Sequence, residues 1–327
     1  MRTDLLSGIG VLYESDEWSD HKLAAELATA LAETCGDDAP TVTMIDMTRE
    51  DCVERALGCD MLVSRVFASA RFRGHDAALA RKERLVDEAQ IRGIVMINEP
   101  RAHRYEVSKV ASTRALAEAG LLAPAIIAVG MPEELDVSAF AYPYIIKPDC
   151  GGRSTHTLLA HDADEARRFL AHAPAMPFVV QEYVEPEFGY VTRIEVVDDA
   201  LPLIAKRSIG EGGLSSYHAG STYELYPDCP DDVRDAALRA ARALGISFGS
   251  FDVIETGHGA YFIDANSVSN VSEDCTEIFG FDLMRAHARG MARRYCQMRS
   301  DSDNETDCSE QSVSFTSQVP ERGEMPC

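Results

Sequence analysis

The sequence predicts an α/β protein whose second half is organised as α+β, and three observations support this class. Over residues 1–97, apolar strand segments alternate with amphipathic helical segments, which is typical of a parallel sheet covered by helices. From residue 125 onward, strands follow one another with fewer helices between them, which indicates an α+β organisation there. The chain is 46% hydrophobic and 26% charged, which is the composition of an ordinary globular protein.

In the first part of the chain, short strands and longer helices are expected in regular alternation. No GxGxxG turn follows the first strand, so the pattern gives little support for a dinucleotide-binding site. The expected strands are 9–13, 41–46, 60–66 and 93–97, and the expected helices are 19–35, 49–57 and 74–91.

In the second part, a helix over 107–119 has Ser108 as its expected N-cap, and a helix over 230–244 stops at Gly245. From residue 299 the composition turns to serine and acidic residues, so we expect this tail to be disordered. Strands are expected at 125–129, 143–147, 155–160 and 178–184, mixed strands at 190–209, and helices at 162–172 and 280–298.

Composition excludes several classes of partner. The formal net charge of −23 argues against nucleic acid, because phosphate backbones select basic surfaces. No apolar run approaches the ~20 residues of a membrane span, and the N-terminus lacks a signal-peptide pattern. The nine cysteines form no CxxC pattern, which suits reduced thiols. We therefore expect a cytoplasmic protein with neither a nucleic-acid nor a membrane partner.

The segment 251–267, FDVIETGHGAYFIDANS, is typical of two strands joined by a tight turn. With His258 at the centre of the turn, Ile254 would face Phe262 on the opposite strand.

The same register places Asp252 opposite Asp264, and Asn266 points to the face of Asp264 because it lies two residues further along the strand. Opposed like charges destabilise a strand pair, so a cation is expected between them. Two carboxylates and an amide oxygen suit Mg²⁺. The alternative is a polar hairpin with scattered acids.

Lysine is rare in this chain, which keeps five lysines among its 31 basic residues. Such a sequence keeps lysine mainly where a planar guanidinium cannot replace a compact ammonium. Lys147 ends an apolar strand and precedes Gly151 and Gly152, whose backbone can turn toward an anion. An ordinary turn after a strand is the alternative.

The strand 178–184, FVVQEYV, ends in a polar group that could bind a base. Glu182 could hydrogen-bond an adenine edge while Val184 packs on the ring. The alternative is an acid that is simply solvated at a strand end.

In their order and spacing these residues resemble the ATP-grasp superfamily, most closely its RimK-type carboxylate–amine ligases and more distantly D-alanine–D-alanine ligase. The resemblance covers roughly residues 60–298. The matching segments are SRVFAS at 64–69, Asn98 before Ser108-Lys109 and Thr113, Lys147, Gln181-Glu182-Tyr183-Val184, an ExxxxGxxxR segment at Glu185–Arg193, a Ser-x-x-His-x-Gly element at Ser215–Gly220, and Asp252, Asp264 and Asn266.

The resemblance implies three parts. A Rossmann-like, parallel-sheet pre-ATP-grasp domain would cover 1–100, and a two-subdomain ATP-grasp domain would cover 101–298. Its central and C-terminal subdomains would meet near 178/179, and the acidic tail would occupy 299–327.

The resemblance also implies a nucleotide site between two antiparallel sheets. Lys109 and Lys147 would contact the phosphates, the loop 150–155 would close over them, and Glu182 with the Val184 backbone would recognise adenine. The full ATP-binding set would be Lys109, Lys147, Gly151, Gly152, Ser154, Gln181, Glu182, Tyr183 and Val184.

Asp252, Asp264 and Asn266 would then hold Mg²⁺ as two ions bridged by Asp264, with Mn²⁺ as the alternative metal. Here Asp264 replaces the glutamate that is usual in the family.

Arg193 and either Lys206 or Arg207 would stabilise the γ-phosphate and the tetrahedral oxyanion. The alternative is that such arginines pair with nearby acids. The substrate pocket would contain Ser215, Ser216, Tyr217 and His218.

Three positions depart from the family pattern. Val191 stands where an acid is usual, which removes a ribose contact. Leu214 and Ala219 stand where basic residues are usual, so the substrate is expected to differ from the usual one.

The expected activity is ATP-dependent ligation: a carboxylate becomes an acyl-phosphate and an amine converts it to an amide, with ADP and phosphate released. The partners would be a small-molecule or peptide carboxylate and an amine or amino acid, and the relatives suggest a homodimer through the N-terminal domain. A phosphotransferase and a nucleotide-binding regulator without turnover are the alternatives. The retained metal ligands argue against the regulator.

Overall fold

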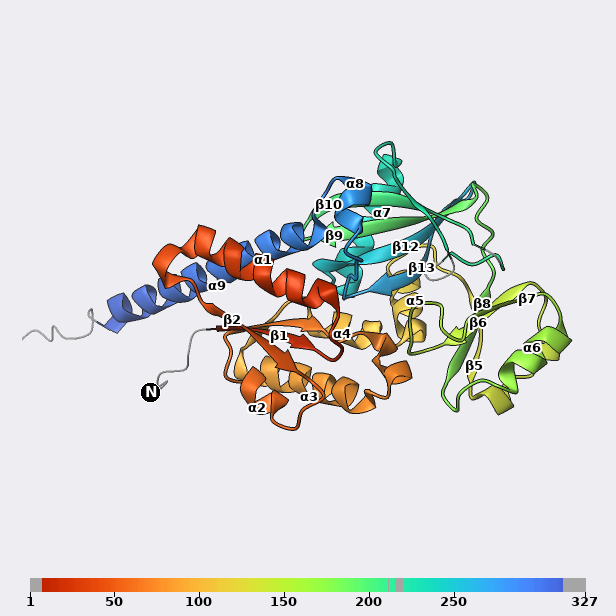
Figure 1. The fold of residues 1–327 in the computed structure, drawn as a ribbon, viewed down its shortest axis with the longest axis horizontal. Helices are drawn as coiled ribbons and strands as arrows, with labels where there is room; N and C mark the ends of the chain where they lie inside the picture. The colour runs from red at the N-terminus through yellow and green to blue at the C-terminus, as the bar shows by residue number, and fades with distance from the viewer. Residues whose placement is uncertain (1–7, 211, 216–219, 314–327) are drawn as a thin grey trace, which may run out of the picture.

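The computed structural model describes residues 8–210, 212–215 and 220–313. Within these ranges, no helix is long and apolar enough to cross a lipid bilayer. Figure 1 shows the N-terminal sheet at one end of the molecule and a small sheet at the other, with the largest sheet above and between them.

The N-terminal part is a four-stranded parallel sheet in the order β2-β1-β3-β4, as the alternating pattern predicts. Helices cover it, and its central strands are apolar because both faces are buried. The strands are β1 (Gly8–Tyr13), β2 (Thr41–Asp46), β3 (Met61–Arg65) and β4 (Val95–Met96), and the helices are α1 (Trp18–Cys35), α2 (Cys52–Ala56) and α3 (Asp76–Arg92).

The small sheet is antiparallel, in the order β5-β8-β6-β7. Its strands are β5 (Ile126–Gly130), β6 (Tyr144–Pro148), β7 (Leu158–Ala160) and β8 (Phe178–Glu182), and α6 (Ala163–Leu170) packs on it. The expected subdomain boundary at 178/179 is wrong, because β8 pairs with both β5 and β6 and so belongs to this sheet. The loop after β6 is also longer than expected, since β7 begins at Leu158.

The largest sheet has the order β11-β10-β9-β12-β13 and is antiparallel throughout. Its strands are β9 (Tyr190–Val197), β10 (Ala200–Ser208), β11 (Tyr223–Leu225), β12 (Phe248–Thr256) and β13 (Gly259–Asn266). The helix α7 (Asp231–Leu244) packs its alanine-rich face on one side of the sheet and ends at Gly245, whose φ is 69°.

The β12–β13 hairpin contains a bulge that changes half of the expected register. Asp252 pairs with Asp264 as expected, but Ile254 pairs with Tyr261 rather than Phe262. The irregularity lies between Asp252 and Val253, where β13 has one extra residue, Ile263.

The helix α4 (Pro100–Glu106) leads into α5 (Lys109–Glu118), and Ser108 caps α5 by accepting a hydrogen bond from Ala111 N. The short α8 (Cys275–Phe279) precedes the last helix, α9 (Leu283–Val313).

The expected disorder from residue 299 is wrong at its start, because α9 continues to Val313. No glycine or proline interrupts the sequence between Met291 and Val319, so the change in composition alone does not end the helix. Residues 314–327 lie outside the described part of the chain.

The N-terminal sheet and α9 share one hydrophobic core. Met284, Ala288 and Met291 of α9 belong to the same buried cluster as Ile9 and Leu27. In Figure 1, α9 runs alongside α1. The C-terminal end of the chain therefore stabilises the first domain.

Asn98 fixes the junction between the first domain and the largest sheet. Its side chain donates to Phe248 O and Ser267 O and accepts from Ser247 N and Phe248 N, each at 2.8 Å. The backbone of Asn98 is left-handed, with φ 68°.

We expect Asn98→Gly to lower the free energy of unfolding by about 3 kcal/mol, because glycine keeps the left-handed backbone but leaves buried backbone groups without partners. Urea unfolding measures this loss. Gln90→Ala on the exposed side of α3 is the control and should change the stability by less than about 0.5 kcal/mol. Equal effects of the two substitutions would contradict the role of Asn98.

Candidate functional site

One face of the largest sheet carries a row of charges across neighbouring strands. Arg193 of β9 is paired with Asp252 of β12, which is paired with Asp264 of β13. We call these three residues the charged row. The opposed carboxylates that the sequence predicts are thus present, and Arg193 lies beside them.

Two arginines neutralise Asp252. Arg207 donates to one carboxylate oxygen at 2.9 Å and Arg193 to the other at 3.2 Å. Burial alone would raise the pKa of Asp252, but the two guanidinium groups outweigh it and lower the pKa to about 2. The expected alternative of strand arginines paired with acids is therefore present in this structure.

Lys109 neutralises the other carboxylate and lies 2.8 Å from Asp264. Burial opposes the charged form of Lys109, but the attraction of Asp264 outweighs it and raises the pKa.

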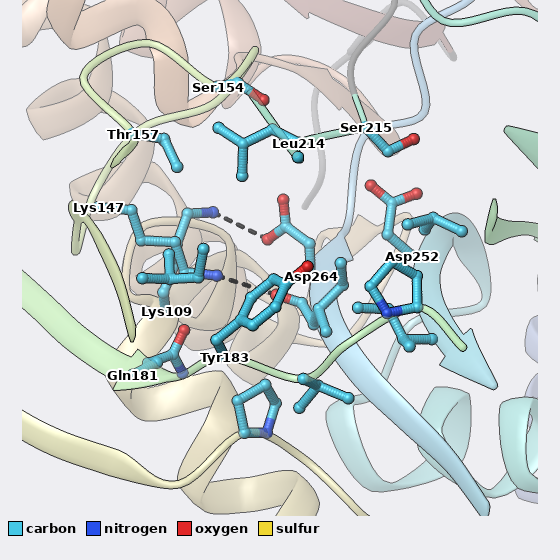
Figure 2. A pocket seen from close by; sticks show the side chains of 18 of the residues that line it. Lys109, Lys147, Ser154, Thr157, Gln181, Tyr183, Leu214, Ser215, Asp252 and Asp264 are labelled. Carbon is cyan, nitrogen blue, oxygen red and sulfur yellow. Dashed lines mark hydrogen bonds and ion pairs between the residues drawn. The ribbon is translucent and has the colours of Figure 1, made fainter. Parts of the chain in front are cut away.

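Lys147 donates to the backbone oxygen of Ile263 at 3.0 Å, which is the extra residue of the bulge. Burial, and then the charge of Lys109, lower the pKa of Lys147 to about 8. Figure 2 shows both lysines pointing toward the hairpin strand that carries Asp264.

The loop after β6 covers this site. Gly151 is needed for a close approach rather than for a left-handed backbone, because a Cβ there would lie 2.6 Å from Phe72. The left-handed residues of the loop are instead Arg153, Ser154 and His156, with φ 60°, 54° and 53°. Gly152 and Ser154 line the pocket as expected.

The end of β8 and the residues that follow it supply the opposite side of the pocket. Gln181, Glu182, Tyr183 and Val184 all line it. Gln181 donates to Thr113 at 3.1 Å, and Glu182 accepts from Ala125 N at 3.1 Å.

An apolar floor of this pocket was missed from the sequence. Val191 and Ile254 stand two residues from Arg193 and Asp252 along their strands, and they form a small buried cluster with Val184. Because strand side chains alternate between faces, the period of two could have placed them beside the charged row. Ile209, Leu214 and Thr157 also line the pocket.

The pocket is small, with a volume of about 130 Å³, and a second cavity of about 460 Å³ adjoins it. Arg207, Ser215, Asp252 and Asp264 line both, whereas Asn266 lines only the second. Ser215 accepts a hydrogen bond from Arg207 at 2.8 Å.

The structure separates Lys206 from the site. Its ammonium lies over the rings of Tyr190 and Tyr226, 4.6 and 4.1 Å from their centroids. Arg207, one residue on, points to the charged row because successive strand side chains alternate. Of the two expected alternatives, only Arg207 reaches the site. Ser216, Tyr217 and His218 lie outside the described residues.

The side-chain oxygens of Asp252, Asp264 and Asn266 are ligands that suit a hard cation. Among the described residues, no three His, Cys, Asp or Glu side chains group as a metal site on their own. The ammonium of Lys109 stands beside Asp264 where a cation would bind, and Asn266 offers an amide oxygen two residues away. Few protein carboxylates with remaining positions for water and phosphate suit Mg²⁺.

Comparison with known proteins agrees with this geometry. The RimK-like ATP-grasp domain matches residues 107–285. The chain belongs to the RimK-like ATP-grasp family. A probable alpha-L-glutamate ligase from Nitrosococcus oceani is 25% identical to this RimK-like protein over 220 residues, which are 65% of this chain and 70% of the relative.

Two solved structures share the fold. A RimK domain ATP-grasp protein from Sphaerobacter thermophilus has a TM-score of 0.64 at 18% identity, covering 88% of this chain and 99% of the other. D-alanine–D-alanine ligase from Bacillus anthracis, complexed with ATP, has a TM-score of 0.63 at 14% identity, covering 90% and 99%.

The expected family and fold are confirmed. This chain is an ATP-dependent carbon–nitrogen ligase of the kind that joins a carboxylate to an amine.

We expect ATP binding at pH 8.5 to take up roughly 0.5–0.8 proton, because phosphate contact would recharge a Lys147 that is mostly neutral at that pH. Below pH 7 the uptake should vanish, since Lys147 is then already protonated. Calorimetry in two buffers of different ionisation enthalpy measures it. Lys147→Met should remove the uptake, and an unchanged uptake would contradict this assignment.

Proposed function

We propose that this ligase forms an acyl-phosphate on its carboxylate substrate and passes the acyl group to an amine. The observation that carries the proposal is the charged row beside two lysines, at the junction of the small pocket and the second cavity.

The arginines and lysines of the site each have a role in this reaction. A carboxylate oxygen attacks the γ-phosphorus as ADP leaves, and the amine nitrogen then attacks the acyl carbon as phosphate leaves. Arg207 is buried and Arg193 is partly buried, and both would stand where the negative charge of the two steps develops. Lys109 and Lys147 would bind the phosphates of ATP and hold it for in-line transfer.

Adenine would lie against the apolar cluster of Val184, Val191 and Ile254, with its edge toward Glu182. Val191 offers no hydrogen bond to the ribose, so nucleotide affinity would rest on the base and the phosphates. The Gly151–Ser154 loop would shield the acyl-phosphate from water.

Asp252, Asp264 and Asn266 would hold Mg²⁺. The metal would supply charge neutralisation of the phosphoryl oxygens. Lys109 and the two arginines now neutralise these carboxylates, so they must change partners when metal and nucleotide bind.

The deciding experiment is to measure ADP and AMP release from ATP with Mg²⁺ across a set of carboxylates, with hydroxylamine as the amine. Carboxylate-dependent ADP with a hydroxamate product is the expected result. AMP release would overturn phosphoryl transfer, and a stable phosphorylated product that hydroxylamine leaves intact would favour a phosphotransferase.

We expect Arg207→Gln to lower kcat by about 100-fold or more, because it removes a cation from the transfer point. Lys206→Gln is the matched control on the opposite face of β10 and should leave kcat close to that of the wild type. Initial rates of ADP release compare them. An equal loss in both variants would contradict the assignment of Arg207.

We further propose that the donor is a small-molecule or peptide carboxylate. A homodimer through the first domain and a cytoplasmic location stay predictions.

A further inference from the structure

The second cavity extends from the charged row to the first domain. It is lined by Arg193, Arg207 and Asp252 of the largest sheet, and we call the part lined by Trp18 of α1, Val268 and residues 270–273 its far end. Ser19 donates to Asn270 at 2.6 Å, which holds that far end together.

The cavity has no spare cation among its described lining residues. Its three arginines each form an ion pair with a carboxylate that also lines it: Arg153 with Glu17, Arg193 with Glu195 and Asp252, and Arg207 with Asp252.

Three more carboxylates line the same cavity, namely Glu106, Asp264 and Glu273. Glu106 is buried and accepts hydrogen bonds from Ser267 and from Ala68 N, and Asp264 is paired with Lys109. Glu273 is exposed at the far end, and within the described part of the chain it makes no ion pair. The far end is therefore negative.

This charge distribution favours an amine without a carboxylate over an amino acid. If Arg193 and Arg207 serve the phosphate and the donor carboxylate, only Arg153 remains for a carboxylate on the acceptor, and Glu17 already occupies it. An amino acid would have to break that pair or lie near uncompensated acids. An amine without a carboxylate meets neither obstacle.

Aromatic side chains line the cavity at the far end and also beside Arg207, with which Tyr223 is paired on the neighbouring strand. Trp18 is 37% exposed, and Tyr223 packs edge-to-face on Phe279 at 5.9 Å. Aromatic faces beside a carboxylate attract an ammonium group and also bury apolar carbon.

We propose that the second cavity binds the acceptor, and that this acceptor is an amine with no carboxylate of its own, such as an amino-acid amide or a diamine. The inference rests on the proposed ligase function and names its amine class. In the transfer step the new C–N bond forms, the C–O bond to phosphate breaks with its electrons on phosphate, and the nitrogen releases one proton to solvent.

The chain offers a direct probe, because Trp18 is its single tryptophan. Its fluorescence is titrated with Mg-ADP present, using L-leucinamide against L-leucine and 1,4-diaminobutane against 4-aminobutyrate. We expect each carboxylate-free amine to bind at least about ten-fold more tightly than its acid partner, a difference of about 1.4 kcal/mol. Equal or tighter binding of the acids or of L-glutamate overturns the proposal, as does an absence of response to all these ligands.

A matched pair of variants tests the charge argument. Glu273→Gln should reduce the preference for the diamine by several-fold, whereas Glu277→Gln, exposed on α8 outside the cavity, should leave it unchanged. An unchanged preference in Glu273→Gln overturns the role of the negative far end. Calorimetric Mg-ATP binding is measured in parallel: its absence overturns the proposed function, whereas normal ATP binding with no amine preference overturns only this inference.

Discussion

The opposition of Asp252 and Asp264 is the constraint on which the site depends. Two carboxylates facing each other on adjacent strands repel, and the hairpin forms because cations from three other elements meet them. Arg193 comes from β9, Arg207 from β10 and Lys109 from α5. Four segments of the chain therefore meet at this pair of carboxylates. The substrates of a ligase that consumes ATP would bring similar positive and negative charges to the same place.

The bulge at Ile263 connects this pair to the nucleotide. By inserting one residue beside Asp264, it frees a backbone oxygen that Lys147 contacts from the small sheet. Removal of the bulge would also shift the register, so Asp264 would no longer face Asp252. A local irregularity therefore sets both the carboxylate pair and the contact between the two sheets.

Much of this could be predicted from local patterns. Strand and helix alternation located the parallel sheet, and the order of Lys109, Lys147, Asp252 and Asp264 indicated the family. The sequence-based predictions failed where contacts between residues that are distant in sequence determine the structure. Because of the bulge, Ile254 does not pair with Phe262. Lys206 lies on the opposite face of β10 from the site because strand side chains alternate. β8 belongs to the small sheet because it pairs with a strand on each side. Gly151 lines the pocket, but the close approach of Phe72 that requires a glycine there is invisible in sequence.

The shared core of α1 and α9 has a mechanical consequence. Because α9 returns to pack on α1 and Asn98 fastens the junction to β12, the first domain and the largest sheet are joined at two distant points and form one frame. The small sheet has its own core and joins that frame through residues 119–125 and 183–189. A cleft of about 130 Å³ must widen to admit a nucleotide, and the small sheet is the part that can swing. The Arg153–Glu17 pair would be one of the contacts that such opening breaks.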